Sequence, residues 1–350
     1  MISGAPRPRD DASGYPAPGL TRPCPDNTRV LSVLLVTFPF FALVLAGYVA
    51  ARQRMLPLDA IGGLNSFVLY FALPCLLYRF GADTPIAQLL DPAAVVTYLA
   101  CALLMVAATV KFSLNARIRW NDASFGALVA AFPNTGFMGV PLLVALLGAR
   151  AAGPAILTIL IDLVITSSLC IALSRLDGAG QHGARRAASK ALQGVALNPM
   201  PWAILLGGAS SALGVRPIAP VMDTIVLLAD AASPVALFTI GAVLARSQAV
   251  AAAGEHEAMA ARDYVPVALA KLVAHPLLVW ALGSALRAAG LPLDAFTLKV
   301  MVLVAALPSA SNVSMLAERF GADNGRIARI IMLTTAAAFL SFSGAVALLE

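Results

Sequence analysis

The sequence contains few charged residues. Asp, Glu, Lys and Arg make up only 12% of its 350 residues, whereas hydrophobic residues make up 60%. Soluble domains average about 25% charged residues, so this shortage excludes an ordinary soluble domain and predicts a protein of the lipid bilayer. The net charge of +6 comes from basic residues in short segments between apolar runs rather than from one basic patch. We therefore expect no nucleic-acid partner.

Reactive and metal-binding signatures are also scarce. The four cysteines include no Cys-x-x-Cys pair, which predicts small core thiols, no metal site and no cofactor. The motifs Gly-x-Ser-x-Gly and His-Glu-x-x-His, typical of serine and zinc hydrolases, do not occur. Asp162 and Asp230 could imitate the dyad of an aspartyl protease, but nothing in the sequence brings them together. We do not expect an enzyme.

Long apolar runs dominate what is present. Ten segments of about 17 to 25 residues are each long enough to cross the ~30 Å hydrocarbon layer as a helix. Residues 1–29 are rich in Pro, Gly and charge, which predicts a disordered N-terminal tail. The sequence thus predicts an all-α integral membrane protein with ten transmembrane helices. They are placed at 30–50, 61–80, 93–113, 123–147, 152–174, 196–213, 221–245, 265–288, 296–317 and 327–349.

The distribution of Lys and Arg predicts the orientation. These residues are more frequent on the side of the membrane that holds the basic loop 175–195 than on the other side. Cytoplasmic loops carry the excess of Lys and Arg, so this loop should be cytoplasmic. With ten spans, both termini then lie on the extracytoplasmic side of the cell (inner) membrane.

An internal repeat relates the two halves of the chain. LVAAFPNTGFMGVPLL begins at Leu128 and LVAALPSASNVSML begins at Leu303, so that Pro133 and Pro308 match at the same offset of 175 residues as the two leucines. The unit is five helices, and because five is odd, the second copy enters the membrane from the opposite side. Inverted repeats of this kind are common in secondary transporters. The two five-helix repeats are 30–174 and 196–350.

The matched prolines predict broken helices. Proline inside a helix removes a backbone hydrogen bond and clashes with the preceding turn, so the fourth and ninth helices should be interrupted and should cross. Each half-helix after a break presents unpaired N–H groups and the positive end of its dipole, an arrangement that suits an anion. Alternatively, the nearby polar groups only re-bond the broken backbone. The predicted substrate-binding residues are Pro133, Asn134, Thr135, Gly136, Pro308, Ser309, Ser311 and Asn312.

Four ionisable residues lie inside predicted spans: Asp162, Asp230, Lys271 and His275. An isolated charge at the bilayer centre costs about 3 kcal/mol or more, so partners are expected. We expect Asp230 and Lys271 to face each other, since they lie on sequential helices. All four residues are candidates for coupling or gating, and the alternative is a purely structural ion pair.

The chain resembles the auxin efflux carrier family, which includes plant auxin exporters and bacterial malonate-type permeases. The resemblance runs from about Phe38 to the C-terminus. Four segments carry it: FPNTGFMGVPLL from Phe132, LNSFVLYFALPCLL from Leu64, ADAASPVALFTIGAVLA from Ala229, and AALPSASNVSML from Ala305.

The resemblance implies a fold like that of bile-acid symporters and sodium/proton antiporters. Helices 1, 2, 6 and 7 would form a scaffold that dimerises, and helices 3–5 and 8–10 would form the moving transport domain. Pro133, Asn134 and Pro308 fall on the crossover positions of the family.

We therefore expect a secondary transporter of a small organic anion, a mono- or dicarboxylate of malonate or auxin type, working by alternating access. Its partners are the bilayer, a second copy in a homodimer and, as a candidate coupling ion, the proton. Two alternatives stay open, an ion-coupled cation or proton exchanger and a channel. An exchanger would require carboxylates at the crossing, where the sequence places amides and hydroxyls.

Overall fold

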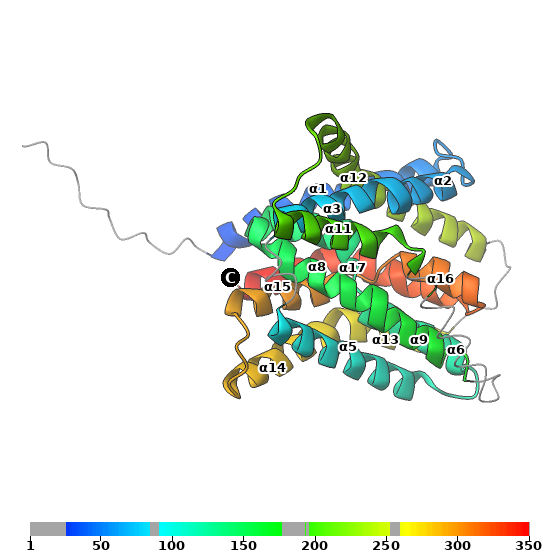
Figure 1. The fold of residues 1–350 in the computed structure, drawn as a ribbon. Helices are drawn as coiled ribbons and strands as arrows, with labels where there is room; N and C mark the ends of the chain where they lie inside the picture. The colour runs from blue at the N-terminus through cyan, green and yellow to red at the C-terminus, as the bar shows by residue number, and fades with distance from the viewer. Residues whose placement is uncertain (1–25, 85–90, 177–192, 194–195, 253–259, 350) are drawn as a thin grey trace, which may run out of the picture.

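The computed structural model describes residues 26–84, 91–176, 193, 196–252 and 260–349, and every regular element in these residues is a helix (Figure 1). The α-helices are α1 (Asp26–Arg52), α2 (Ala60–Phe67), α3 (Leu73–Asp83), α5 (Pro92–Ser113), α6 (Trp120–Ala131), α7 (Val140–Leu147), α8 (Ala152–Ile161), α9 (Ser167–Leu173), α11 (Pro199–Leu213), α12 (Ala219–Ala252), α13 (Val265–Leu269), α14 (His275–Ala288), α15 (Ala295–Ala306), α16 (Asn312–Phe320) and α17 (Asn324–Leu349).

Six helical stretches in the described residues are long and apolar enough to cross a membrane. The other four predicted spans also contain helices: α1 covers 30–50 as one helix of 27 residues, the 15-residue α11 lies in 196–213, and 123–147 and 296–317 are interrupted after α6 and α15. The expected integral membrane protein is therefore confirmed, whereas ten crossings and inverted repeats stay predictions. Most of the predicted tail and of the loop 175–195 lies outside the described residues; α1 begins at Asp26.

Several long helices contain one wider, π-helical turn. Three of these turns are followed directly by an α-helical segment whose second residue is proline. These prolines are Pro74, Pro141 and Pro276. Proline has no N–H to donate, so the hydrogen-bond ladder widens in front of it. The fourth turn precedes Ser167, whose hydroxyl donates to the carbonyl of Asp162 at 2.8 Å. The turns are η1 (Val68–Ala72), η2 (Thr135–Gly139), η4 (Asp162–Thr166) and η6 (Ala270–Ala274).

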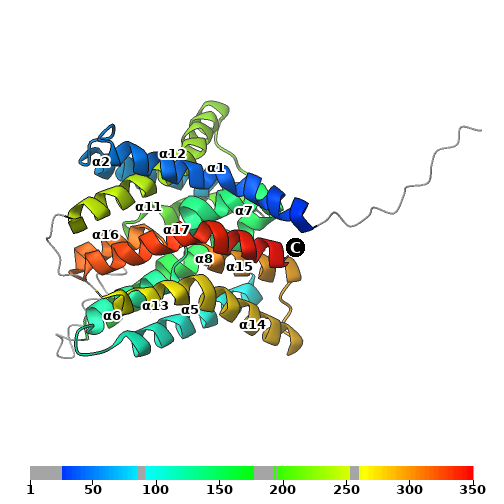
Figure 2. The same ribbon diagram turned by 180° about the vertical axis from the view of Figure 1, so that it is seen from behind.

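The helices form two groups. α12 packs against α1 and α3, and α3 also packs against α11. Both views place α1, α2, α3, α11 and α12 along one side, with α5, α13 and α14 along the opposite side (Figures 1 and 2). Between them, α6 and α15 are buried along most of their length. These two short helices are apolar all round because protein surrounds them.

Two glycines allow α1 and α12 to touch backbone to backbone. A Cβ atom added to Gly241 of α12 would overlap the carbonyl oxygen of Val44 in α1, and one added to Gly47 would overlap the carbonyl oxygen of Phe238. Such close approach is typical of helix contacts in membranes, where small residues let backbones pack directly.

We expect Gly241→Ala to lower the free energy of unfolding by about 1–3 kcal/mol, because the overlap is with backbone and the helices must move apart. Thermal unfolding of purified protein in detergent would measure this. Gly63→Ala is the matched control, since a Cβ there meets nothing within 4 Å. It should be neutral or stabilising by up to about 1 kcal/mol, the helix preference for alanine. Equal effects at both positions would contradict the close contact.

Candidate functional site

The two helix breaks lie side by side. α6 ends at Ala131 and α15 at Ala306, and the chain segments that follow form an antiparallel bridge between Pro133 and Ser309. The N–H of Asn134 donates to the carbonyl of Pro308 at 2.8 Å, and the N–H of Ala310 donates to the carbonyl of Phe132 at 3.0 Å. The predicted interruptions, and their crossing, are confirmed.

The crossing provides hydrogen-bond partners for the backbone groups that the prolines leave unpaired. Backbone groups freed from a helix inside a membrane need partners within the protein, and here each break supplies partners for the other. Ser309 contributes as well, because its hydroxyl donates to the carbonyl of Val129 in the last turn of α6 at 2.7 Å. Its N–H donates to the hydroxyl of Thr334 at 3.3 Å. With these two hydrogen bonds, Ser309 stabilises the crossing.

A small cavity of about 20 Å³ lies against the crossing. This volume admits about one water molecule. Among the predicted site residues, Pro133, Asn134, Gly136 and Asn312 line it. Leu73 of α3 and Met200 of α11 also line it.

The cavity offers hydrogen-bond donors that the protein does not use. In the described residues, the side-chain amide of Asn134 makes no hydrogen bond, and the N–H groups of Gly136 and Asn312 have no acceptor. The side-chain oxygen of Asn312 and the hydroxyl of Thr135 are buried without a partner. Buried polar groups are normally paired. Asn134 and Asn312 thus bring unused polar groups from two helix starts to one small cavity.

A second cavity of about 30 Å³ adjoins the first through Phe137, which lines both. Its polar lining includes Ser311 and Ser314 of the second break region, Asn65 of α2 and the oppositely charged Arg246 and Glu318. Phe137 itself is buried. The side chain therefore separates the crossing from a more polar compartment.

Three of the four predicted intramembrane charges gather behind the crossing. Asp162, Lys271 and His275 are all fully buried. Asp162 accepts hydrogen bonds from the Tyr98 hydroxyl at 2.9 Å and the Thr166 hydroxyl at 3.1 Å. Lys271 attracts this carboxylate electrostatically, although its own hydrogen bonds go to the Ala305 carbonyl at 2.6 Å and to Nδ1 of His275 at 3.2 Å.

The expected contact between Asp230 and Lys271 is wrong. Asp230 on α12 instead pairs with Arg79 of α3 at 2.6 Å. α12 packs against α1 and α3, whereas η6, which carries Lys271, packs against α6, α15 and α17. Sequential helices here belong to different groups, so adjacency along the chain did not give adjacency in space.

We expect Asp230→Asn to lower the free energy of unfolding by less than about 1 kcal/mol. The side chain of Asp230 is 63% exposed, and ion pairs with exposed members contribute little. Thermal unfolding beside wild type would check this. A loss of several kcal/mol would mean that the pair is shielded from both water and headgroups.

The sequence did not single out Leu73, Phe137, Met200 or Tyr98. Phe137 lies inside the quoted motif after Pro133, so its position four residues after the break was the available signal. Leu73 and Met200 are apolar residues in apolar helices, and no pattern in the sequence distinguishes them from lipid-facing neighbours.

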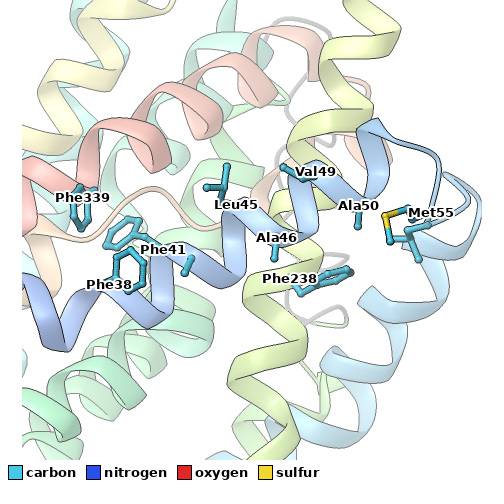
Figure 3. Close-up of a pocket in the computed structure, with 11 residues that line it drawn as sticks. Phe38, Phe41, Leu45, Ala46, Val49, Ala50, Met55, Phe238 and Phe339 are labelled. Carbon is cyan, nitrogen blue, oxygen red and sulfur yellow. The ribbon is translucent and has the colours of Figure 1, made fainter.

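A larger groove of about 840 Å³ runs along α1 (Figure 3). It is lined by apolar side chains, among them Phe38, Leu45 and Met55 of the α1 region, Phe238 of α12 and Phe339 of α17. Figure 3 shows no charged side chain among its lining residues. Its lining residues offer nothing to neutralise an anion, so we do not assign substrate binding to it.

Comparison with known proteins places these features in a family. A family model described as "Membrane transport protein" matches residues 32–346. A protein of Rhizobium meliloti (strain 1021) named "Putative malonate transporter" is 29% identical over 315 residues, covering 88% of this chain and 93% of that protein. "Uncharacterized transporter YfdV" of Escherichia coli (strain K12) is 27% identical over 292 residues, covering 81% and 86%.

A plant relative matches over a shorter stretch. "Auxin efflux carrier component 3" of Arabidopsis thaliana is 26% identical over 151 residues, which is 42% of this chain and 23% of that protein. The family match spans nearly the whole chain and includes both helix breaks and the cavity between them. The chain is therefore a multi-pass membrane transporter, not an enzyme, and belongs to the membrane transport protein family of auxin efflux carriers.

Proposed function

We propose that the protein is a secondary carrier of a small organic anion that works by alternating access at the crossing. The observation that carries this proposal is the cavity where two half-helices begin, with the Asn134 and Asn312 side chains and the unused N–H groups of Gly136 and Asn312 around it. No carboxylate lines this cavity. Neutral donors and two positive helix ends favour an anionic ligand.

The relatives suggest the chemical class. The names of two of them specify malonate and auxin, both carboxylic acids. We infer a mono- or dicarboxylate substrate, whose carboxylate would accept hydrogen bonds from Asn134, from Asn312, from the Thr135 hydroxyl and from the backbone N–H of Gly136. Pro133, Pro308, Ser309 and Ser311 would shape and hold the site.

The cavity volume supports a moving mechanism. A cavity that holds about one water is too small for any carboxylic acid, so the site must open before a substrate enters. Leu73 and Met200 close it from the scaffold side. We propose that helices 1, 2, 6 and 7 (α1, α2–α3, α11 and α12) form a fixed scaffold and that the remaining helices move past it.

The same proposal includes ten crossings in two inverted repeats, a homodimer formed through the scaffold, and both termini on the outer face of the inner membrane. Matched breaks that meet at one point support the repeat. For coupling, we propose the buried group Asp162, Lys271 and His275, with the proton as a candidate ion. Asp230 would contribute to coupling or gating through its ion pair with Arg79.

An ion-coupled cation exchanger and a channel are the competing functions. An exchanger of cations needs carboxylates at the crossing, but Asp162 lies behind it, bonded to Tyr98 and Thr166. A channel needs a continuous wet path, whereas Phe137 separates the two cavities. Both observations favour a carrier of anions.

Proteoliposomes test the proposal. Vesicles loaded with unlabelled malonate should accumulate labelled malonate against its gradient, and the uptake should saturate. A panel of mono- and dicarboxylates in a thermal-shift assay would rank substrates, with neutral amides of the same acids as controls. Flux that never saturates and shows no counterflow would indicate a channel. Stabilisation by cations but by no acid would indicate an exchanger.

A further inference from the structure

Lys271 places a positive charge at the end of a broken helix. The residue lies on the π-turn η6 and is fully buried. Its Nζ donates at 2.6 Å to the carbonyl of Ala305, in the last turn of α15 next to the break. The ammonium therefore lies at the C-terminal end of α15, next to the second break, and Lys271 is not one of the residues that line the cavity of about 20 Å³.

This position is one that attracts cations. The last four carbonyls of a helix have no partner within the helix, and the C-terminal end carries a partial negative charge. In transporters with broken helices, such carbonyl ends coordinate the diffusible coupling cation. The end of α6 is different, because its Val129 carbonyl accepts a neutral hydroxyl from Ser309. A charged group is thus built into only one of the two helix ends.

The ammonium lies among groups that can accept a hydrogen bond from a cation or attract its charge. Besides the Ala305 carbonyl, Nδ1 of His275 lies 3.2 Å away, and the carboxylate of Asp162 attracts the charge from nearby. The hydroxyls of Tyr98 and Thr166 hold Asp162 in place. Carbonyl and carboxylate oxygens are the groups that hard cations prefer.

We propose that the ammonium of Lys271 is a built-in cation that takes the place of a diffusible metal cation at the crossing, so that the protein needs no sodium. This proposal rests on the proposed carrier function. The covalently held charge stabilises the helix end, in both orientations of the moving domain, without being released.

Chemical rescue tests the proposal without any organic anion. Purified Lys271→Ala protein should unfold at a lower temperature than wild type, and n-butylammonium chloride should restore much of the loss in a saturable way. n-Butanol, which has the same alkyl chain without the charge, should restore little. Lys299→Ala, a change near the start of α15, should show no response to n-butylammonium. Wild-type unfolding should be the same in sodium, potassium and N-methylglucamine chloride.

The rescue experiment and the salt comparison can each overturn the proposed role of Lys271. Equal rescue by butanol and butylammonium would show a packing role only, and specific stabilisation of wild type by sodium would show that a metal site exists besides Lys271; either would overturn the proposal. If Lys271→Ala cannot be purified, the sodium response of wild type decides alone. Because these measurements contain no carboxylic acid, a failure to find an anionic substrate would count against the carrier function and not against the cation site.

Discussion

Replacing Asn134 by aspartate should abolish binding of the organic anion, and replacing it by alanine should weaken binding by about 1–3 kcal/mol. Asn134 is buried and follows the first break, and its side-chain amide makes no hydrogen bond in the described residues. Alanine would leave a desolvated carboxylate without one donor, which accounts for the smaller loss. Aspartate would place a like charge beside the ligand, and such juxtaposition costs several kcal/mol.

Thermal-shift titration and uptake by proteoliposomes would measure both variants. Asn121→Ala is the control, because Asn121 is another partly buried asparagine away from the cavity, although its amide is already used, donating to the carbonyl of Gly321 at 2.9 Å. It should lower the unfolding temperature without changing the affinity. Wild-type affinity in a well-folded Asn134→Asp protein would remove Asn134 from the site.

The sequence predicted the helix breaks well because proline has a local effect. Pro133 and Pro308 lack the N–H that a helix needs, wherever they lie in the fold. Their crossing followed from the internal repeat, which is also visible in the sequence. The amide residues Asn134 and Asn312 then came together at one cavity because the crossing fixes both segments, whereas the hydroxyl residue Ser311 lines the neighbouring cavity.

Contacts between distant segments could not be predicted in the same way. Asp230 pairs with Arg79, 151 residues earlier, and the partner of a charge in a helix depends on how helices are grouped. Three of the four π-turns had a local signal in the following prolines. Asp162 and Lys271, which lie on two of the π-turns, come within range of an electrostatic interaction only through tertiary packing. Phe137, Leu73 and Met200 are apolar residues among many, so only the cavity distinguishes them.

Neutralising one member of the Asp162 and Lys271 pair should lower the free energy of unfolding by about 3–5 kcal/mol. Both side chains are fully buried, and removing one leaves the other charge uncompensated in a medium of low dielectric constant. Asp162→Asn and Lys271→Gln would each do this with little change in volume. Denaturant or thermal unfolding in detergent would measure the two single variants and the double variant.

The double variant separates stability from transport. Asp162→Asn with Lys271→Gln contains no unpaired charge, and its amides can still bond Tyr98 and the Ala305 carbonyl, so it should regain most of the stability lost in the single variants. The exposed pair of Arg216 and Asp83, 2.9 Å apart with side chains 64% and 50% exposed, is the control, and its coupling energy should stay below about 1 kcal/mol. If the buried charge serves transport, the stable double variant should bind the organic anion but move it far more slowly than wild type. Full transport by the double variant would mean that the pair only holds the fold together, and His275 would then be the remaining member of the buried group to test.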